Sequence, residues 1–272
     1  MDDAAVDPRS VLFVTIDSCR FDTFCEARAP HLRSLGPLHR AVAPSHFTLG
    51  SHASMFVGFT PHVPHSREPF LNPKLAKLFK LGRSAWPGAA EPAFRLEGEN
   101  VVDGFRREGY VTLGTGSVRW FDPATPSALA LTRHFGRFFF PRGARKLEDQ
   151  LEWIEGCLAE AAGAGPVFLF LNVGETHVPY HHPGAPWEAG HNPCIPFGTA
   201  NDPGECRRRQ LACLEWVDER LAPLVERFRS ATTLACADHG DCWGEDGLWE
   251  HGIPHEMTLT VPLLLRVRGS PI

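Results

Sequence analysis

The sequence has no apolar run of the roughly 18 to 20 residues that a membrane-spanning helix needs. Its first 10 residues are acidic and polar, and they lack the basic and apolar regions of a signal peptide. The sequence therefore predicts a cytoplasmic protein that has no membrane partner.

The sequence also lacks an excess of either charge. Its 27 Lys and Arg residues stand against 32 Asp and Glu residues, which gives a formal net charge of -5. This balance provides no positive field for a nucleic acid, so no nucleic-acid partner is expected. The 8 cysteines show neither zinc-ribbon nor CxxC spacing. A chain of 272 residues buries enough apolar surface to fold without disulfides, so reduced and mostly buried thiols are expected.

What the sequence does contain is an alternation of short apolar runs and helical patterns. Strands are predicted at residues 11–16, 110–113, 166–173 and 232–237. Helices are predicted at residues 49–56, 101–108, 147–162 and 205–228. This order predicts an α/β fold of three layers, with a mostly parallel central sheet and helices on both faces. Ligands of such sheets bind at the carboxyl ends of the strands.

Three long stretches rich in Pro and Gly separate these elements, at residues 60–97, 117–146 and 174–203. They show no sustained periodicity, and loops of this length in a compact domain are usually binding elements. The sequence shows no internal repeat and no domain boundary. We therefore predict a single domain over residues 1–272, in which the three stretches are loops around the active site.

Acidic and imidazole side chains follow two of the predicted strands. Asp238 and His239 end one strand, and Gly240 permits a sharp turn directly after them. Asp17 follows another strand. If the two strands are neighbours, both carboxylates and the imidazole can turn toward one cation, and this donor set suits Zn²⁺ or Mn²⁺. The alternative is an ordinary strand-to-loop turn, in which Asp and Gly are favoured anyway.

Thr48 lies where a loop enters a predicted helix. As an N-cap, its hydroxyl would accept backbone N–H bonds, a role that Ser51 could fill equally well. Beside a cation, the same hydroxyl would be activated as a nucleophile, and the helix N-terminus would offer amides to a phosphoryl group. The sequence alone leaves both interpretations open.

Three segments resemble, in this order, the alkaline phosphatase superfamily and most of all its sulfatase-like branch of hydrolases and phosphotransferases. They are VLFVTIDSCRFD, APSHFTLGSHASMFVGFTPHVPH, and ADHGDCWGEDGLWEHG followed by TVPLLLRV. Two further segments, GETHVPY and LACLEWVDERLAPLVERF, are similar to that branch's His-x-Pro-Tyr element and to the helix before its Asp-His-Gly strand. The likeness covers both ends and the middle of the chain and leaves the long loops unmatched.

The resemblance implies an alkaline-phosphatase-like fold and a divalent metal, with Zn²⁺ as the first choice and Mn²⁺ as the alternative. The metal ligands that it implies are Asp17, Thr48, Asp238 and His239. Thr48 is also the nucleophile by this resemblance, and His177 matches the His that contacts the oxygens of the bound anion. His251 matches the His of a later His-Gly element. These two imidazoles would neutralise charge or move protons.

Departures from the sulfatase pattern favour phosphate chemistry. Sulfatases have Cys or Ser at the nucleophile position within Cys-x-Pro-Ser-Arg, whereas this sequence has Thr48, with Gly50 for the Pro and His52 for the Arg. An unmodified Thr matches the phosphotransferase members. We therefore predict a metal-dependent phosphatase, phosphodiesterase or phosphoryl-group transferase that acts on a small-molecule phosphate ester. The alternatives are a sulfatase or phosphonate-ester hydrolase of the same superfamily, or a degenerate member that serves as a binding module.

A second metal site would need an extra carboxylate beside His177, His251 or His255, and Glu175 is the nearest candidate. Arg20 follows Asp17 closely and could orient that carboxylate or have no catalytic role. The sequence thus predicts one metal site directly and leaves a second one open.

Overall fold

The computed structural model describes residues 5–58, 79–83, 92–96 and 99–272. The strands that it shows in the main sheet are β1 (Val11–Ile16), β2 (His39–Val42), β5 (Val111–Gly116), β6 (Arg137–Phe139), β7 (Val167–Val173), β8 (Thr232–Cys236), β11 (Thr260–Val267) and β12 (Ser270–Pro271). Two small hairpins pair β3 (Phe79–Arg83) with β4 (Pro92–Leu96), and β9 (Cys242–Trp243) with β10 (Trp249–Glu250).

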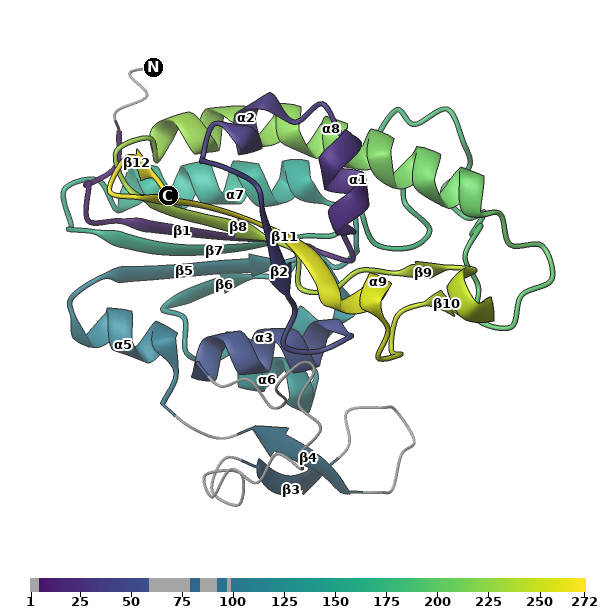
Figure 1. Cartoon of the computed structure of the whole chain (residues 1–272). Helices are drawn as coiled ribbons and strands as arrows, with labels where there is room; N and C mark the ends of the chain where they lie inside the picture. Colours follow the sequence, from purple (N-terminus) through teal and green to yellow (C-terminus); the bar gives the residue numbers. More distant parts are fainter. Residues whose placement is uncertain (1–4, 59–78, 84–91, 97–98) are drawn as a thin grey trace.

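The main sheet has the order β12-β11-β8-β1-β7-β5-β6, with β2 paired to β11 (Figure 1). Strand β1 pairs in parallel with β7 and β8, and β5 pairs in parallel with β6 and β7. Strand β11 runs antiparallel to β8. The predicted mostly parallel sheet is therefore confirmed, with an antiparallel edge built from the last apolar run of the sequence.

Helices cover both faces of this sheet. The α-helices in the described residues are α1 (Phe21–Glu26), α2 (Pro30–Arg33), α3 (Thr48–Val57), α5 (Val101–Arg107), α6 (Pro126–Thr132), α7 (Leu147–Glu160), α8 (Pro203–Arg227) and α9 (Glu256–Leu259). Figure 1 shows α1, α2, α7 and α8 on one face and α3, α5 and α6 on the other. The predicted three-layer α/β architecture is confirmed.

Two hydrophobic clusters hold the layers together, and β1 contributes side chains to both of them. Leu12 and Val14 point to the cluster under α7 and α8, whereas Phe13 points to the aromatic cluster on the α3 side. In that second cluster Phe56 of α3 meets Phe170 of β7 edge to face, with ring centroids 5.1 Å apart. The long β-branched and aromatic runs are thus buried on both faces, as strands in the middle of a covered sheet must be.

The prediction that residues 117–146 form a loop is wrong. The segment contains the 3-10 turn η1 (Arg119–Phe121), helix α6 and strand β6. These elements are too short to show a period, and they are held by Phe121, Leu131 and Phe135, which pack into the aromatic cluster. In the predicted loop 60–97, the described residues form the β3–β4 hairpin, and the remainder lies outside the described residues. Residues 174–202 carry no helix or strand before α8 begins.

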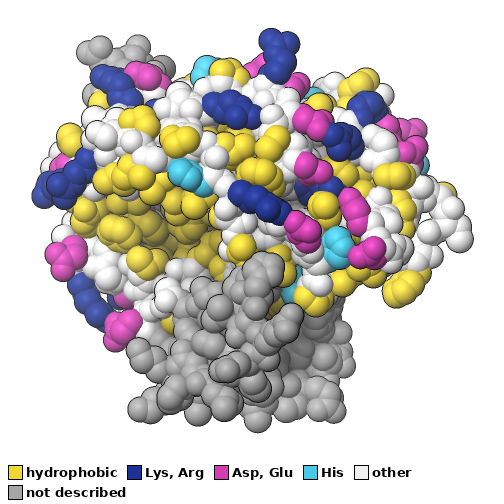
Figure 2. Space-filling view, in the orientation of Figure 1, with side chains coloured by type: hydrophobic (Ala, Val, Ile, Leu, Met, Phe, Trp, Pro, Cys, Tyr) yellow, Lys and Arg dark blue, Asp and Glu magenta, His cyan; other side chains and the backbone are white. Residues whose placement is uncertain are grey.

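The distribution of surface charge and the state of the cysteines match what the composition predicts. Figure 2 shows basic and acidic side chains interspersed over the described part of one face. All eight cysteines are free thiols, and every one except Cys25 is buried. No helix in the described part of the chain is long and apolar enough to cross a membrane.

Candidate metal centre and active site

The two acidic strand ends meet at one edge of the sheet. Strands β1 and β8 are direct parallel neighbours, so Asp17 and Asp238 follow them at the same edge. Both side chains are fully buried. The backbone N–H of Ser18 donates to Asp238 Oδ1 over 3.2 Å, which ties the two strand ends together. The structure therefore brings together the carboxylates that the sequence predicted would converge.

The ligand atoms of this site have the spacing that a shared cation requires. His239 Nε2 lies 3.6 Å from Asp17 Oδ1 and 3.5 Å from Asp238 Oδ2. Thr48 Oγ1 lies 3.3 Å from His239 Nε2 and 3.5 Å from Asp17 Oδ2. Tetrahedral ligands held at about 2.0 to 2.2 Å from Zn²⁺ lie about 3.3 to 3.6 Å from one another. The four residues thus fit a divalent metal.

Thr48 does not act as an N-cap. It is the first residue of α3, the cap position is Phe47, and no side chain caps this helix. The Ser51 hydroxyl donates to the carbonyl oxygen of Asp238 over 2.6 Å, so it braces the site from behind. The Thr48 hydroxyl is left to face the carboxylate and imidazole group.

His239 is held in the form that a metal ligand needs. Its Nδ1 lies 3.0 Å from the carbonyl oxygen of Gly240, so the proton sits on Nδ1 and the Nε2 lone pair faces the two carboxylates. Burial and the neighbouring His251 lower the pKa of His239 to about 3. The ring is therefore neutral near pH 7, as metal binding requires.

A cation would stabilise the two buried carboxylates. Burial raises the pKa of both Asp17 and Asp238, and the charge of Asp238 raises that of Asp17 further. Asp238 Oδ2 is a buried oxygen for which the described residues provide no hydrogen-bond donor. A buried, unpartnered carboxylate oxygen beside a second carboxylate is costly unless a positive charge offsets it. This orphaned atom is independent support for a metal at the site.

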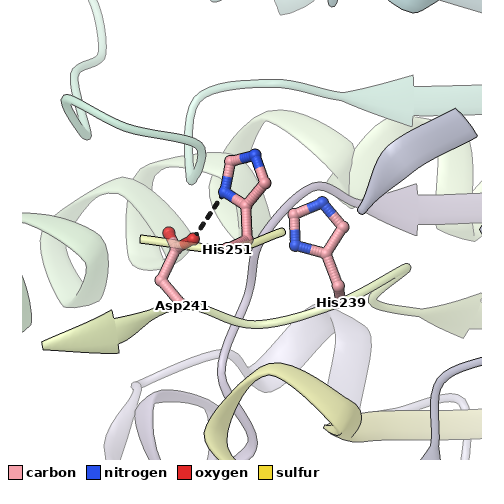
Figure 3. Close-up of side chains that lie close together, drawn as sticks. All are labelled: His239, Asp241 and His251. Carbon is pink, nitrogen blue, oxygen red and sulfur yellow. Dashed lines mark hydrogen bonds and ion pairs between the residues drawn. The ribbon is translucent and has the colours of Figure 1, made fainter. Parts of the chain in front are cut away.

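A second group of side chains lies beside the first. Figure 3 shows Asp241 bonded to His251, with the ring of His239 alongside. Asp241 Oδ1 and His251 Nδ1 are 2.8 Å apart. The ring centroid of His251 lies 4.5 Å from that of His239 and 4.9 Å from that of His177. The ring of His251 therefore lies against both other imidazoles.

This second group is built to carry positive charge. Burial lowers the pKa of His251, but the hydrogen bond and negative charge of Asp241 outweigh burial and raise the pKa to about 9. Burial raises the pKa of Asp241, and its bond to His251 more than reverses that effect, so the carboxyl is ionised. His239, Asp241 and His251 also have ligand atoms within 4.8 Å of one another. The group can hold a second cation, or it can offer a protonated imidazole to an anion.

Two of the residues named for a second metal site from sequence, Glu175 and His255, cap helices instead, whereas His251 lies in the second group. Glu175 Oε1 accepts the backbone N–H of Leu147 over 2.9 Å and so caps the N-terminus of α7. His255 accepts the backbone N–H of Met257 on Nδ1 and caps α9. Neither residue belongs to a group of ligand atoms in the described part of the chain. Glu175, the nearest candidate for an extra carboxylate, therefore lies outside the group, and the carboxylate beside His251 is that of Asp241.

Arg20 does not orient Asp17 by any contact that the structure shows. Its guanidinium bonds to Asp22, to Glu245 over 2.7 Å and to the carbonyl oxygen of Asp241 over 3.2 Å. The side chain is buried and lies 4.0 Å above the ring of Trp243. Arg20 therefore fixes the loop after β8 that carries Asp241.

A buried polar chain behind the site escaped the sequence analysis. Asn172 Nδ2 donates to Asp17 Oδ2 over 3.3 Å and to Thr15 Oγ1 over 3.2 Å. Thr15 Oγ1 lies 2.9 Å from His52 Nε2, and His52 Nδ1 lies 2.8 Å from the carbonyl oxygen of Thr48. The signal was present, since an Asn inside an apolar strand and a His on a buried helix face must find partners.

Comparisons with known proteins support the fold. No family model matches the sequence, and no curated protein matches it significantly. The C-terminal periplasmic domain of phosphoethanolamine transferase EptC from Campylobacter jejuni matches with a TM-score of 0.66 and 12% identity, over 97% of this chain and 80% of that one. The zinc complex of the Escherichia coli EptC domain matches with a TM-score of 0.64 and 15% identity, over 99% and 75%. Phosphonate monoester hydrolase from Silicibacter pomeroyi has a TM-score of 0.64 and 15% identity, over 96% and 68%.

These structures have the alkaline-phosphatase-like fold, so the predicted resemblance is confirmed at the level of the fold. The predicted cytoplasmic location is contradicted, because several matching structures are periplasmic domains. The location was inferred only from the polar N-terminal residues and the missing apolar run, and the matching structures are themselves single domains named as periplasmic.

Proposed function

We propose that the chain is a metal-dependent hydrolase of phosphoric esters, or a phosphoryl-group transferase, in which Thr48 is the nucleophile. The observation that carries this proposal is the position of the Thr48 hydroxyl, which lies within 3.5 Å of both His239 Nε2 and Asp17 Oδ2. A hydroxyl with only a structural role would cap α3, and this one does not. Every position of the metal and nucleophile set holds a chemically competent side chain, which argues against a degenerate binding module.

Asp17, Asp238 and His239 would hold one divalent metal together with Thr48. The mixed oxygen and nitrogen donors suit Zn²⁺, with Mn²⁺ as the alternative. The zinc complex of a protein with the same fold supports this choice. When bound, such a metal acts as a Lewis acid that lowers the pKa of a neighbouring hydroxyl and offsets anionic charge.

The chain's own groups supply the rest of the reaction. Thr48 Oγ1 gives up its proton to solvent water and attacks phosphorus in line, the ester oxygen leaves with its bonding electrons, and a phosphothreonine results. Backbone N–H groups in the first turn of α3 face the phosphoryl oxygens. His251 lies against the ring of His239, and His177 lies against that of His251, where a protonated ring can neutralise the anion or protonate the leaving oxygen. Attack by water or by an acceptor hydroxyl then frees Thr48.

We further propose that the whole chain acts as one domain and that its partner is a small-molecule phosphate ester, with no nucleic acid. Segment 174–203 contains His177, which lies against His251, and we propose that this segment selects the substrate. Exchanges within residues 184–190 should therefore change substrate preference and leave the metal content intact.

The test combines metal analysis of the purified protein with a substrate panel. The panel holds p-nitrophenyl phosphate, bis(p-nitrophenyl) phosphate, p-nitrophenyl phenylphosphonate and p-nitrophenyl sulfate. Metal-dependent release of p-nitrophenol from either phosphate supports the proposal. Turnover of the phosphonate or the sulfate alone favours the alternative hydrolases. A protein that binds no metal and hydrolyses none of the four is the binding module.

A further inference from the structure

The loops after β7 and β8 meet in a buried chain of hydrogen bonds that ends on His251. Trp243 Nε1 donates to Tyr180 Oη over 2.9 Å, and the Tyr180 hydroxyl donates to Asp241 Oδ2 over 2.8 Å. Asp241 Oδ1 lies 2.8 Å from His251 Nδ1. Tyr180 and Asp241 are fully buried and 61 residues apart in sequence. These hydrogen bonds thus join two segments that are distant in sequence at the Asp241 carboxylate.

The direction of each hydrogen bond follows from the groups involved. An indole N–H only donates, so the Tyr180 oxygen accepts from Trp243, and its own proton goes to Asp241. The Asp241 carboxylate accepts on both oxygens, from Tyr180 on one side and from His251 Nδ1 on the other. With Nδ1 engaged, Nε2 of His251 is the nitrogen left to act on a substrate.

Tyr180 is itself held firmly. Its φ of 56° lies in the left-handed region, which is unfavourable for a non-glycine residue and persists only where the surroundings enforce it. Its N–H donates to the carbonyl oxygen of His177, and its carbonyl oxygen accepts from Trp187 Nε1, each over 2.8 Å. The enforced backbone places the phenol where it meets Asp241.

We propose that Tyr180 is a positioning residue for the reaction: it fixes the rotation of the Asp241 carboxylate and thereby aims the His251 ring at the group formed by His239 and Thr48. Asp241 has no other side-chain donor on Oδ2 among the described residues. Without the phenol hydroxyl, the carboxylate can turn and His251 loses its fixed orientation. The kinetic part of this inference rests on the proposed function, whereas the structural part does not.

The direct test is Tyr180→Phe, which removes only the hydroxyl. We expect kcat for p-nitrophenyl phosphate to fall about tenfold, the loss typical of one hydrogen bond to a charged group, with little change in KM or metal content. Tyr110→Phe is the matched control, because Tyr110 is the other tyrosine of the chain and, among the described residues, its hydroxyl donates to the carbonyl oxygen of Arg9 on the exposed surface. That variant should keep wild-type kcat.

A double-mutant cycle separates positioning from general damage. In a His251→Ala background, Tyr180→Phe should cause little further loss, because the residue through which Tyr180 acts is gone. An equal loss in both backgrounds would overturn the proposal.

A spectroscopic measurement tests the positioning role without requiring catalytic activity. In protein labelled with ¹⁵N-histidine, Tyr180→Phe should shift or broaden the Nδ1–H resonance of His251, and Tyr110→Phe should not. Trp243→Phe serves as a second variant if Tyr180→Phe does not fold, since it removes the donor to Tyr180 and should shift the same resonance. An unchanged resonance would overturn the proposal. If the wild-type protein hydrolyses no ester, the proposed function fails, and this resonance alone decides the positioning role.

Discussion

The Thr48 hydroxyl lies 3.3 Å from His239 Nε2, although 191 residues separate the two. The contact is possible because α3 places its first residue against the end of β8, where Ser51 bonds to the carbonyl oxygen of Asp238. A helix start and a strand end thereby complete one group of four potential ligand atoms. This arrangement makes Thr48 the position at which nucleophile and structural residue can be told apart.

Thr48→Ala should lower kcat by several orders of magnitude while the protein stays folded, because the attacking hydroxyl is lost. Thr48→Ser should keep appreciable activity, since a hydroxyl remains. Steady-state kinetics with metal restored, together with mass spectrometry for phosphothreonine, are the measurements. Ser51→Ala is the control and should cost far less activity. Full activity in metal-loaded Thr48→Ala would show that a group other than Thr48 is the nucleophile.

Asp238→Asn should abolish metal binding and yet leave the metal-free protein at least as stable as the metal-free wild type. The orphaned Oδ2 of Asp238 and its repulsion of Asp17 destabilise the metal-free site, so we expect a chelator to lower the melting temperature of the wild type. The metal-free variant should melt at or above the metal-free wild type, because one buried charge is gone. Elemental analysis and thermal melts with and without chelator measure both effects.

Asp149→Asn is the control for that experiment, because its side chain is half exposed on α7. It should change neither metal content nor the response to chelator. A variant Asp238→Asn that retains wild-type metal content would remove Asp238 from the ligand set.

Much of this fold could be predicted from the sequence, because its strands and long helices are dense and periodic. The apolar run of β1 matches the prediction at both ends, and those of β7 and β8 match within one residue. Residues 126–132 and 137–139 could not be found in this way, since α6 and β6 are short and depend on packing against the aromatic cluster. Local periodicity detects elements that are stable in themselves and misses those that tertiary contacts create.

The candidate site divides in the same manner. Asp17 and Asp238 could be placed together because parallel strands end at one edge of a sheet. The bond between Tyr180 and Asp241 could not be predicted, since no rule of spacing relates residues 61 positions apart on two loops. Asp241 lies within the segment ADHGDCWGEDGLWEHG, but its role depends on which side chains the fold brings to it.

Glu175 should make the stability of the protein depend on pH. Burial raises its pKa to about 7, against an ordinary value of 4.5, although the N–H of Leu147 partly offsets that effect. Between these pH values the folded state keeps a proton that the unfolded state has released. The free energy of unfolding should therefore fall as pH rises from about 4.5 to about 7, by on the order of 3 kcal/mol.

The measurement is urea denaturation of the wild type and of Glu175→Gln across this pH range. The variant keeps an acceptor for Leu147 and loses the titration, so the difference in unfolding free energy between the two proteins should follow the predicted fall. Glu148→Gln is the control, because its side chain is exposed in the first turn of α7, the turn whose N-terminus Glu175 caps. Parallel pH profiles for wild type and Glu175→Gln would show that Glu175 does not titrate there.

Gly240→Ala tests whether the turn after His239 tolerates a side chain. A Cβ at this position would lie 2.2 Å from the carbonyl oxygen of Met257, so the backbone must move. The same turn carries the carbonyl oxygen that fixes Nδ1 of His239, and a displaced turn weakens the ligand set. We expect a loss of about 1 to 3 kcal/mol in unfolding free energy and weaker metal binding. Gly156→Ala on α7 is the control, because nothing lies within 4 Å of its new Cβ and the helix should gain up to about 1 kcal/mol. A Gly240→Ala protein with wild-type metal affinity and stability would mean that this turn has room to relax and that the orientation of His239 does not depend on it.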